Sequence, residues 1–233
     1  DTTGYLRLSK FSRTTCKECD EAIGKMIDSG MKYLIFDLRD NTGGYLDQAV
    51  LLSDLFLQKD SMVVYMEGLH RKREEFRASG RGRYQDLKLA VLINEGTASA
   101  AEIFAGAMQD NGRALVYGRR SFGKGLVQEP VNFSDGSGLK LTTARFYTPS
   151  GRCIQKPYSE DYALEVYKRY SEGEMLSADS LKLSKGGILP DVFVPIDTTK
   201  VSDFYLKCSR KATEMRFASD FFDHHAAELS AID

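Results

Sequence analysis

Residues 91–118 read VLINEGTASAAEIFAGAMQDNGRALVYG. The apolar runs at both ends predict buried strands, over Leu87–Ile93 and Ala114–Gly118. Between them, Asn94–Thr97 is a polar turn, and the small and apolar residues of Ala98–Gln109 predict a helix. A strand, a helix and a second strand in this order are typical of an α/β fold with parallel pairing.

The same alternation continues on both sides of this stretch. We predict further strands over Gly4–Leu8, Tyr33–Leu38, Ser61–Met66 and Gly138–Tyr147, and extended chain over Ile188–Val192. We predict helices over Thr15–Ser29 and Leu46–Leu57, a charged loop or hairpin over Glu67–Asp86, a polar helical or irregular stretch over Tyr158–Lys185 and a terminal helical region over Val201–Ala231. The expected class is therefore α/β with a mixed, largely parallel sheet and flanking helices.

Composition excludes several classes of protein. The 233 residues are 42% apolar and 28% charged, which is ordinary for a globular chain of one large or two small domains. The 32 basic residues balance 33 acidic ones, and this argues against a dedicated nucleic-acid surface. No apolar run reaches the ~18–20 residues needed to span a bilayer.

The cysteines and histidines point to no metal centre and no histidine base. Cys16 and Cys19 form the one close cysteine pair, whereas a zinc knuckle needs a second pair of ligands. Incidental thiols are favoured over a redox C-x-x-C motif. None of His70, His224 and His225 follows a predicted strand or lies in a glycine-framed turn. A Ser-His-Asp hydrolase is therefore not indicated, and G-x-S-x-G is also absent.

Ser99 is the first candidate for catalysis. It lies where a buried strand turns into a helix, so the first N–H groups of that helix can stabilise an oxyanion nearby. The structural alternative is a capping box, because Ser99 and Glu102 have the S-x-x-E spacing.

Lys124 is the second candidate, within GRRSFGKG (118–125). The pattern begins like a P-loop, but Gly125 replaces the hydroxyl residue that would hold Mg²⁺, and the following 126–131 segment is extended and contains a proline. A lysine acts as a general base when burial lowers its pKa, and the apolar neighbours of Lys124 predict such burial. A plain surface turn is the alternative.

The turn after Tyr33–Leu38 is the third candidate. Its sequence, RDNTGG (39–44), ends in two glycines. Gly44 has no side chain to block an approaching oxyanion, so its backbone N–H is a candidate donor. Taken alone, the segment is an ordinary turn.

Together these segments resemble the carboxyl-terminal processing proteases, or tail-specific proteases. The matching stretches are LIFDLRDNTGG (34–44), 91–118 as quoted above, SFGKGLVQ (121–128), SGLKLTTARFYTPSGRCIQ (137–155) and GILPDV (187–192). The resemblance implies a ClpP/crotonase-like α/β fold and a Ser-Lys endopeptidase. It places the nucleophile on Ser99, the general base on Lys124 and the glutamine that orients the lysine on Gln128. The implied oxyanion donors are the backbone N–H groups of Gly44 and Ala100.

An even separation also puts Gln128 on the same face as Lys124, provided that the segment is extended. The family usually has serine where this chain has Ala101. The resemblance covers most of residues 4–195. We therefore expect a catalytic domain over 1–233, with its core at 4–195, a helical extension over about 196–233 and no PDZ domain in this chain.

The resemblance also predicts partners and location. The expected substrates are polypeptides with apolar C-terminal tails, bound in an extended conformation. No cofactor, no metal, no nucleic acid and no membrane insertion by this chain are expected, and a homo-oligomer is an open alternative. The expected location is the bacterial cell envelope, periplasmic or extracytoplasmic. A non-proteolytic peptide-binding module on the same fold is the competing hypothesis.

Overall fold

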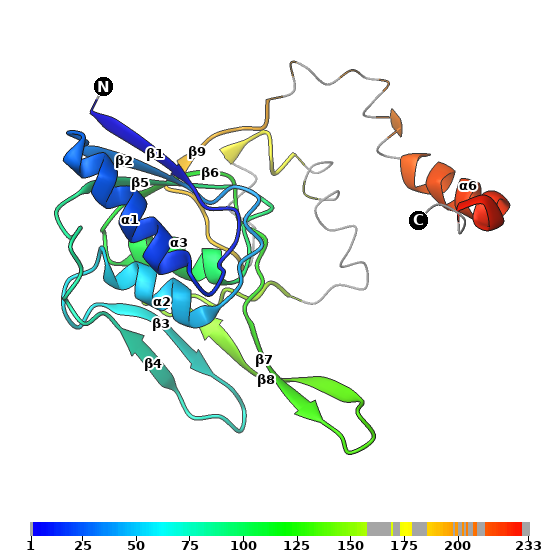
Figure 1. Ribbon diagram of the computed structural model, residues 1–233, viewed down its shortest axis with the longest axis horizontal. Helices are drawn as coiled ribbons and strands as arrows, with labels where there is room; N and C mark the ends of the chain where they lie inside the picture. Colours follow the sequence, from blue (N-terminus) through cyan, green and yellow to red (C-terminus); the bar gives the residue numbers. More distant parts are fainter. Residues whose placement is uncertain are drawn as a thin grey trace.

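A five-stranded parallel sheet is the larger of the two sheets in the described part of the computed structural model (Figure 1). The structure describes residues 2–157, 169, 173–178, 186–197, 199, 202, 204, 207–208 and 213–229. In spatial order the strands are β1 (Thr3–Arg7), β2 (Tyr33–Asp37), β5 (Lys88–Ile93), β6 (Leu115–Gly118) and β9 (Val192–Phe193). Parallel neighbours require crossover connections, and helices provide three of them. These helices are α1 (Thr15–Asp28), α2 (Leu46–Asp54) and α3 (Ala100–Asp110).

A second sheet is antiparallel throughout. Its order is β4 (Glu74–Arg77), β3 (Met62–Glu67), β8 (Gly138–Tyr147) and β7 (Leu126–Asn132). The β7–β8 hairpin projects from the body as an arm (Figure 1). The α/β class is confirmed, and the mixed pairing is divided between two sheets. The charged 67–86 segment forms the β3–β4 hairpin and the loop after it.

The predicted elements up to Tyr147 are confirmed, with ends that shift by a few residues at most. The predicted helix from Leu46, for example, ends at Asp54. In the C-terminal region, α6 (Thr213–Leu229) confirms part of the predicted helical extension and lies apart from both sheets in Figure 1. The predicted polar segment 158–185 falls mostly outside the described residues. No helix in the described part of the chain is both long and apolar enough to cross a membrane.

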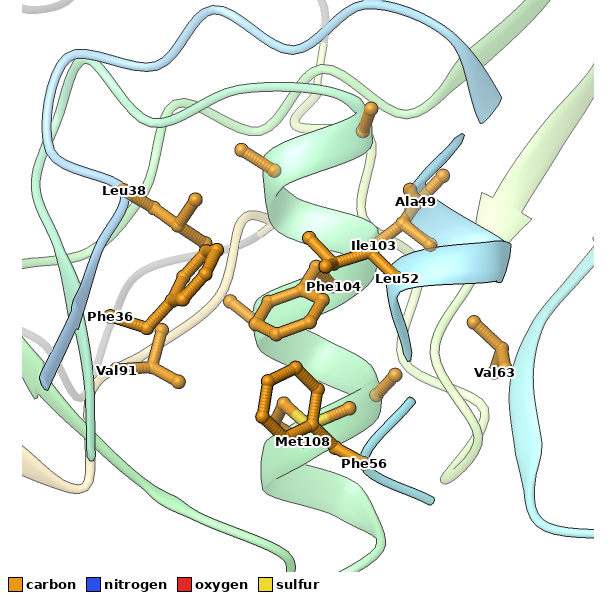
Figure 2. Packing of buried hydrophobic residues seen from close by; sticks show 14 of the residues in the cluster. Phe36, Leu38, Ala49, Leu52, Phe56, Val63, Val91, Ile103, Phe104 and Met108 are labelled. Atoms are coloured by element: carbon orange, nitrogen blue, oxygen red, sulfur yellow. The ribbon is translucent and has the colours of Figure 1, made fainter. Parts of the chain in front are cut away.

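The core is built around α3. Figure 2 shows the rings of Phe36 and Phe56 close to Phe104, with ring centroids 5.1 and 5.9 Å from that of Phe104. All three side chains are fully buried, so truncating Phe104 to alanine would cost about 3–5 kcal/mol. Every residue of α3 from Ala100 to Met108 is buried, and one of them is Glu102. A fully buried carboxylate needs hydrogen-bond donors, and its donors define the site described next.

Candidate functional site

Ser99 occupies the turn between β5 and α3 in a strained backbone conformation. Its φ of 56° and ψ of −119° lie where residues other than glycine are rare. Such a conformation costs about 1–3 kcal/mol and persists only where surrounding contacts impose it. Here the preceding turn is anchored: Ala98 N–H donates to Asn41 O (2.8 Å), and Thr97 Oγ1 donates to Leu38 O (2.8 Å). The turn therefore holds Ser99 in a defined orientation.

One buried carboxylate joins Ser99 to the segment that carries Lys124. Glu102 Oε2 accepts the backbone N–H of Ser99 and the backbone N–H of Lys124, each at 2.8 Å. Glu102 Oε1 accepts the Gly123 N–H (2.7 Å) and the Ser121 hydroxyl (2.5 Å). Because a single oxygen binds both backbones, Ser99 and Lys124 are close neighbours in the folded chain.

The sequence indicated only part of the role of Glu102. The capping interaction is present, since its carboxylate accepts the Ser99 N–H, but three further donors come from residues 121–124. Burial raises the pKa of Glu102, and the four donors oppose this shift by favouring the carboxylate. An acidic residue inside an otherwise apolar helix was the available signal.

The expected burial of Lys124 is wrong. Its side chain is exposed, whereas Gly123 and Gly125 on either side are buried. A Cβ at Gly125 would lie 2.4 Å from Gln155 N, and one at Gly123 would lie 2.9 Å from Lys156 Cβ. The flanking peptides therefore pack inward, and Lys124 projects outward between them.

Lys124 lines an open cavity of about 470 Å³. The other lining residues are Asp40, Thr42, Glu95, Gly96, Ala98 and Phe122. Within the described residues the Lys124 ammonium has no hydrogen-bond or ion-pair partner, and no hydrogen bond joins it to Ser99 Oγ. The two side chains are thus placed on neighbouring backbones, with no hydrogen bond between them in the described part of the chain.

Two backbone N–H groups beside Ser99 are available to an oxyanion. The Gly43 N–H is already used, because it donates to Asn41 Oδ1 at 2.8 Å. The N–H groups of Gly44 and Ala100 have no partner in the described part of the chain. Ala100 is the first residue of α3, whose N-terminal N–H groups have no intrahelical acceptor.

The start of the 39–44 turn is held by a buried carboxylate. Asp37 accepts hydrogen bonds from the Tyr5 hydroxyl (2.5 Å) and from Arg39 through both its backbone N–H and its Nε (2.9 Å each). Burial opposes the charge of Asp37, but the hydrogen bonds from Arg39 and Tyr5 outweigh it and lower the pKa of the carboxyl. Sequence analysis assigned no role to Asp37, since its partner Tyr5 is on another strand.

Comparisons with known proteins identify the family of the chain. The family model described as Peptidase family S41 matches residues 2–164. The chain belongs to peptidase family S41. The resemblance to carboxyl-terminal processing proteases is thereby confirmed at the level of the family.

Several individual relatives are named as proteases. A probable CtpA-like serine protease of Staphylococcus epidermidis is 43% identical over 153 residues, which are 65% of this chain and 31% of that protein. A carboxyl-terminal-processing protease of Synechocystis sp. is 42% identical over 153 residues, 66% of this chain and 35% of that protein. The solved structure of a photosystem II D1 C-terminal processing protease superposes with a TM-score of 0.67 at 32% identity, covering 83% of this chain and 42% of that one. The chain thus spans about a third of the length of its curated relatives.

Gln128 makes no hydrogen bond or ion pair with the other predicted site residues in the described part of the chain. It is exposed on β7, which begins at Leu126, so Lys124 precedes the strand. The face alternation that paired Gln128 with Lys124 therefore does not extend to the lysine. The role of Gln128 in this S41 chain stays a prediction that rests on the resemblance.

The alternatives to the S41 site find no support in the described residues. Residues 118–125 lead into β7 instead of a helix, so the P-loop geometry is absent there. No group of three or more His, Cys, Asp or Glu side chains in the described part of the chain is placed to hold a metal ion. His224 and His225 lie on α6, and all four cysteines are free.

Gly43 gives a test of how tightly the 39–44 turn packs against Ser99. A Cβ at Gly43 (φ 91°) would lie 2.7 Å from Ser99 Cβ, whereas one at Gly30 (φ 94°) would meet nothing within 4 Å. Gly43→Ala is therefore expected to lower kcat/KM at least about 10²-fold by displacing Ser99. Gly30→Ala, which suffers the same backbone strain, should only lower stability by about 1–2 kcal/mol. Equal kcat/KM for the two variants would show that Gly43 does not pack against a working nucleophile.

Proposed function

We propose that this chain is the catalytic part of a serine endopeptidase that cleaves polypeptides near their C-terminal tails with a Ser-Lys dyad. The observation that carries the proposal is the pair of hydrogen bonds from the Ser99 and Lys124 backbones to one oxygen of Glu102. Membership of family S41 and the names of the relatives support the reaction class.

The first half of the reaction forms an acyl-enzyme. The neutral Lys124 amine takes the proton of the Ser99 hydroxyl, and Oγ attacks the peptide carbonyl carbon. The carbonyl oxygen becomes negative and is bound by the N–H groups of Gly44 and Ala100. The Lys124 ammonium then gives its proton to the departing amine as the C–N bond breaks.

The second half regenerates the enzyme. Water loses a proton to the Lys124 amine and attacks the acyl carbon, and Ser99 Oγ recovers the proton as the ester bond breaks. Lys124 is exposed in the free chain and lines the open cavity, so a substrate bound there would lie against it.

The cavity beside Lys124 supports an extended substrate with apolar side chains. Phe122 and Ala98 form part of its wall. Burial of apolar surface in such a cavity stabilises binding by about 25 cal/mol per Å². The whole protein's substrates, its location in the cell envelope and its assembly remain proposals drawn from the resemblance.

The test is a cleavage and labelling experiment on the purified chain. An unfolded polypeptide with an apolar C-terminal tail is incubated with it beside the same polypeptide with a charged tail, and the fragments are identified by mass spectrometry. A fluorophosphonate probe is mapped in parallel. Cleavage favouring the apolar tail and labelling at Ser99 are the expected results. Tail binding with neither cleavage nor labelling would instead identify a peptide-binding module.

A further inference from the structure

The segment that carries Lys124 has no regular secondary structure. We call residues 119–125 the lysine loop; none of them belongs to a helix or a strand. Its buried peptide groups therefore need partners from other parts of the chain. The N–H groups of Gly123 and Lys124 donate to Glu102, the Gly123 carbonyl accepts from Lys156 N–H (3.0 Å), and the Gly125 N–H donates to Gln155 Oε1 (2.9 Å). These contacts hold the second half of the loop.

In the first half, the N–H groups of Ser121 and Phe122 donate to the carbonyls of Ile188 (3.0 Å) and Thr97 (2.9 Å), and one arginine adds contacts to the loop carbonyls. The Arg169 guanidinium donates to the carbonyl of Ser121 through Nη1 (3.1 Å) and to the carbonyl of Arg120 through Nη2 (2.5 Å). The planar fork of a guanidinium presents several donors in fixed directions and suits two adjacent carbonyls. Arg169 thus binds the loop backbone a few residues before Lys124.

Glu174 fixes the direction of that guanidinium. Its Oε1 accepts from Arg169 Nε (2.9 Å) and from Arg120 Nε (2.7 Å), and its Oε2 accepts from Arg120 Nη2 (2.9 Å). The side chains of Arg169, Arg120 and Glu174 are only 4%, 5% and 11% exposed. Two buried guanidinium groups near each other repel unless a carboxylate lies between them, and removing one partner of such a group is costly. Glu174 therefore holds Arg169 against the loop and also binds the side chain of Arg120, which belongs to the loop.

These contacts come from outside the stretch that matches the family model. The match ends at residue 164, and Arg169 and Glu174 follow it. Neither residue lines the cavity beside Lys124. Any effect of Arg169 or Glu174 on the reaction would therefore act through the lysine loop.

We propose that Arg169 and Glu174 are positioning residues that hold the lysine loop so that Lys124 stays beside Ser99. The proposal rests on the proposed role of Lys124 as general base. A shift of about 1 Å in a catalytic group can lower the rate 10²-fold, so loosening this loop should act on kcat. Substrate binding should change less than kcat, because most of the cavity lining comes from the turns after β2 and β5, and the lysine loop contributes only Phe122 and Lys124.

The decisive comparison is between Arg169→Met and Arg113→Met. The Arg113 guanidinium also donates to backbone carbonyls, those of Phe56, Tyr84 and Leu87, but these flank other elements. Each variant loses guanidinium bonds to backbone carbonyls, and Arg169→Met also loses the ion pair with Glu174. We expect Arg169→Met to lower kcat about 10–100-fold with KM changed less than about twofold, and Arg113→Met to lower only the melting temperature.

Two further variants separate charge from geometry. Arg169→Lys keeps the charge but cannot bridge two carbonyls, so it should restore little of kcat. Glu174→Gln removes the carboxylate charge that both arginines share and should resemble Arg169→Met. If kcat per folded molecule in both Arg169 variants equals that of the unaltered chain, the proposal is overturned and the network is structural only.

Hydrogen exchange distinguishes this proposal from the proposed function. Peptides covering residues 119–125 should exchange about tenfold faster in Arg169→Met than in the unaltered chain or in Arg113→Met. Faster exchange in a chain that proves inactive from the start would retain the role of Arg169 in holding the loop and reject the peptidase. Unchanged exchange would reject the positioning role, whatever the activity.

Discussion

Replacing Ser99 or Lys124 with alanine is expected to lower kcat for an unfolded, apolar-tailed polypeptide by about 10⁴-fold or more. Ser99→Ala removes the attacking oxygen, and Lys124→Ala removes the group that takes its proton. The fold should survive, because Ser99 is tied to Glu102 through its backbone N–H and the Lys124 ammonium has no partner among the described residues. Fragment release and thermal melting measure the two effects.

The Lys124→Arg variant tests whether Lys124 acts as a general base or only as a positive charge. An arginine side chain stays protonated and cannot accept the serine proton, so this variant should be as inactive as Lys124→Ala. Lys140→Ala, at another exposed lysine on β8, is the matched control and should retain full activity. Substantial cleavage by Lys124→Arg would assign Lys124 an electrostatic role, and full activity of Lys124→Ala would refute the dyad.

Glu102→Gln is expected to lower kcat by about 10²-fold and the free energy of unfolding by about 1–3 kcal/mol. The carboxylate accepts four donors, two on each oxygen. A glutamine amide replaces one of those oxygens with a donor NH₂ group, so two donors lose their acceptor. The loss in stability is limited, because the variant no longer buries a charge.

Measuring kcat and the free energy of unfolding in urea separately shows whether Glu102 joins the two halves of the site or only caps α3. Glu21→Gln on the exposed face of α1 is the control, and it should leave both quantities unchanged. A variant that loses stability but keeps its kcat would show that Glu102 only caps α3. A large fall in kcat with a small fall in stability is the signature of a group that joins the two halves of the site.

The candidate residues in the turns could be predicted, because each turn is formed by residues that are neighbours in the sequence. A serine between a buried strand and a helix is visible in residues 91–102, and the Gly43–Gly44 pair follows an apolar run that the structure shows as β2. The Gly44 N–H was a candidate from the sequence, and the Ala100 N–H was implied by the resemblance to a known family. The structure adds that the neighbouring Gly43 N–H is taken by Asn41 Oδ1.

Other features could not be predicted, because they depend on contacts between distant segments. Whether Lys124 is buried depends on how Gly123 and Gly125 pack against residues 154–156. The sequence suggested burial from apolar neighbours alone, and the packing of those glycines turned the side chain outward. The Arg169–Glu174 network is likewise invisible to periodicity, since its acceptors are backbone carbonyls some fifty positions away.

Local sequence was sufficient to determine the α/β class and the position of most helices and strands, and it marked Ser99 and Lys124 as candidates, because apolar periodicity and turn chemistry act over a few residues. Tertiary packing was required to bring Ser99 and Lys124 together, since no local pattern records that one buried oxygen of Glu102 accepts both backbones. The desolvation cost of that carboxylate is the physical reason, because it is offset only when donors from both segments converge on it.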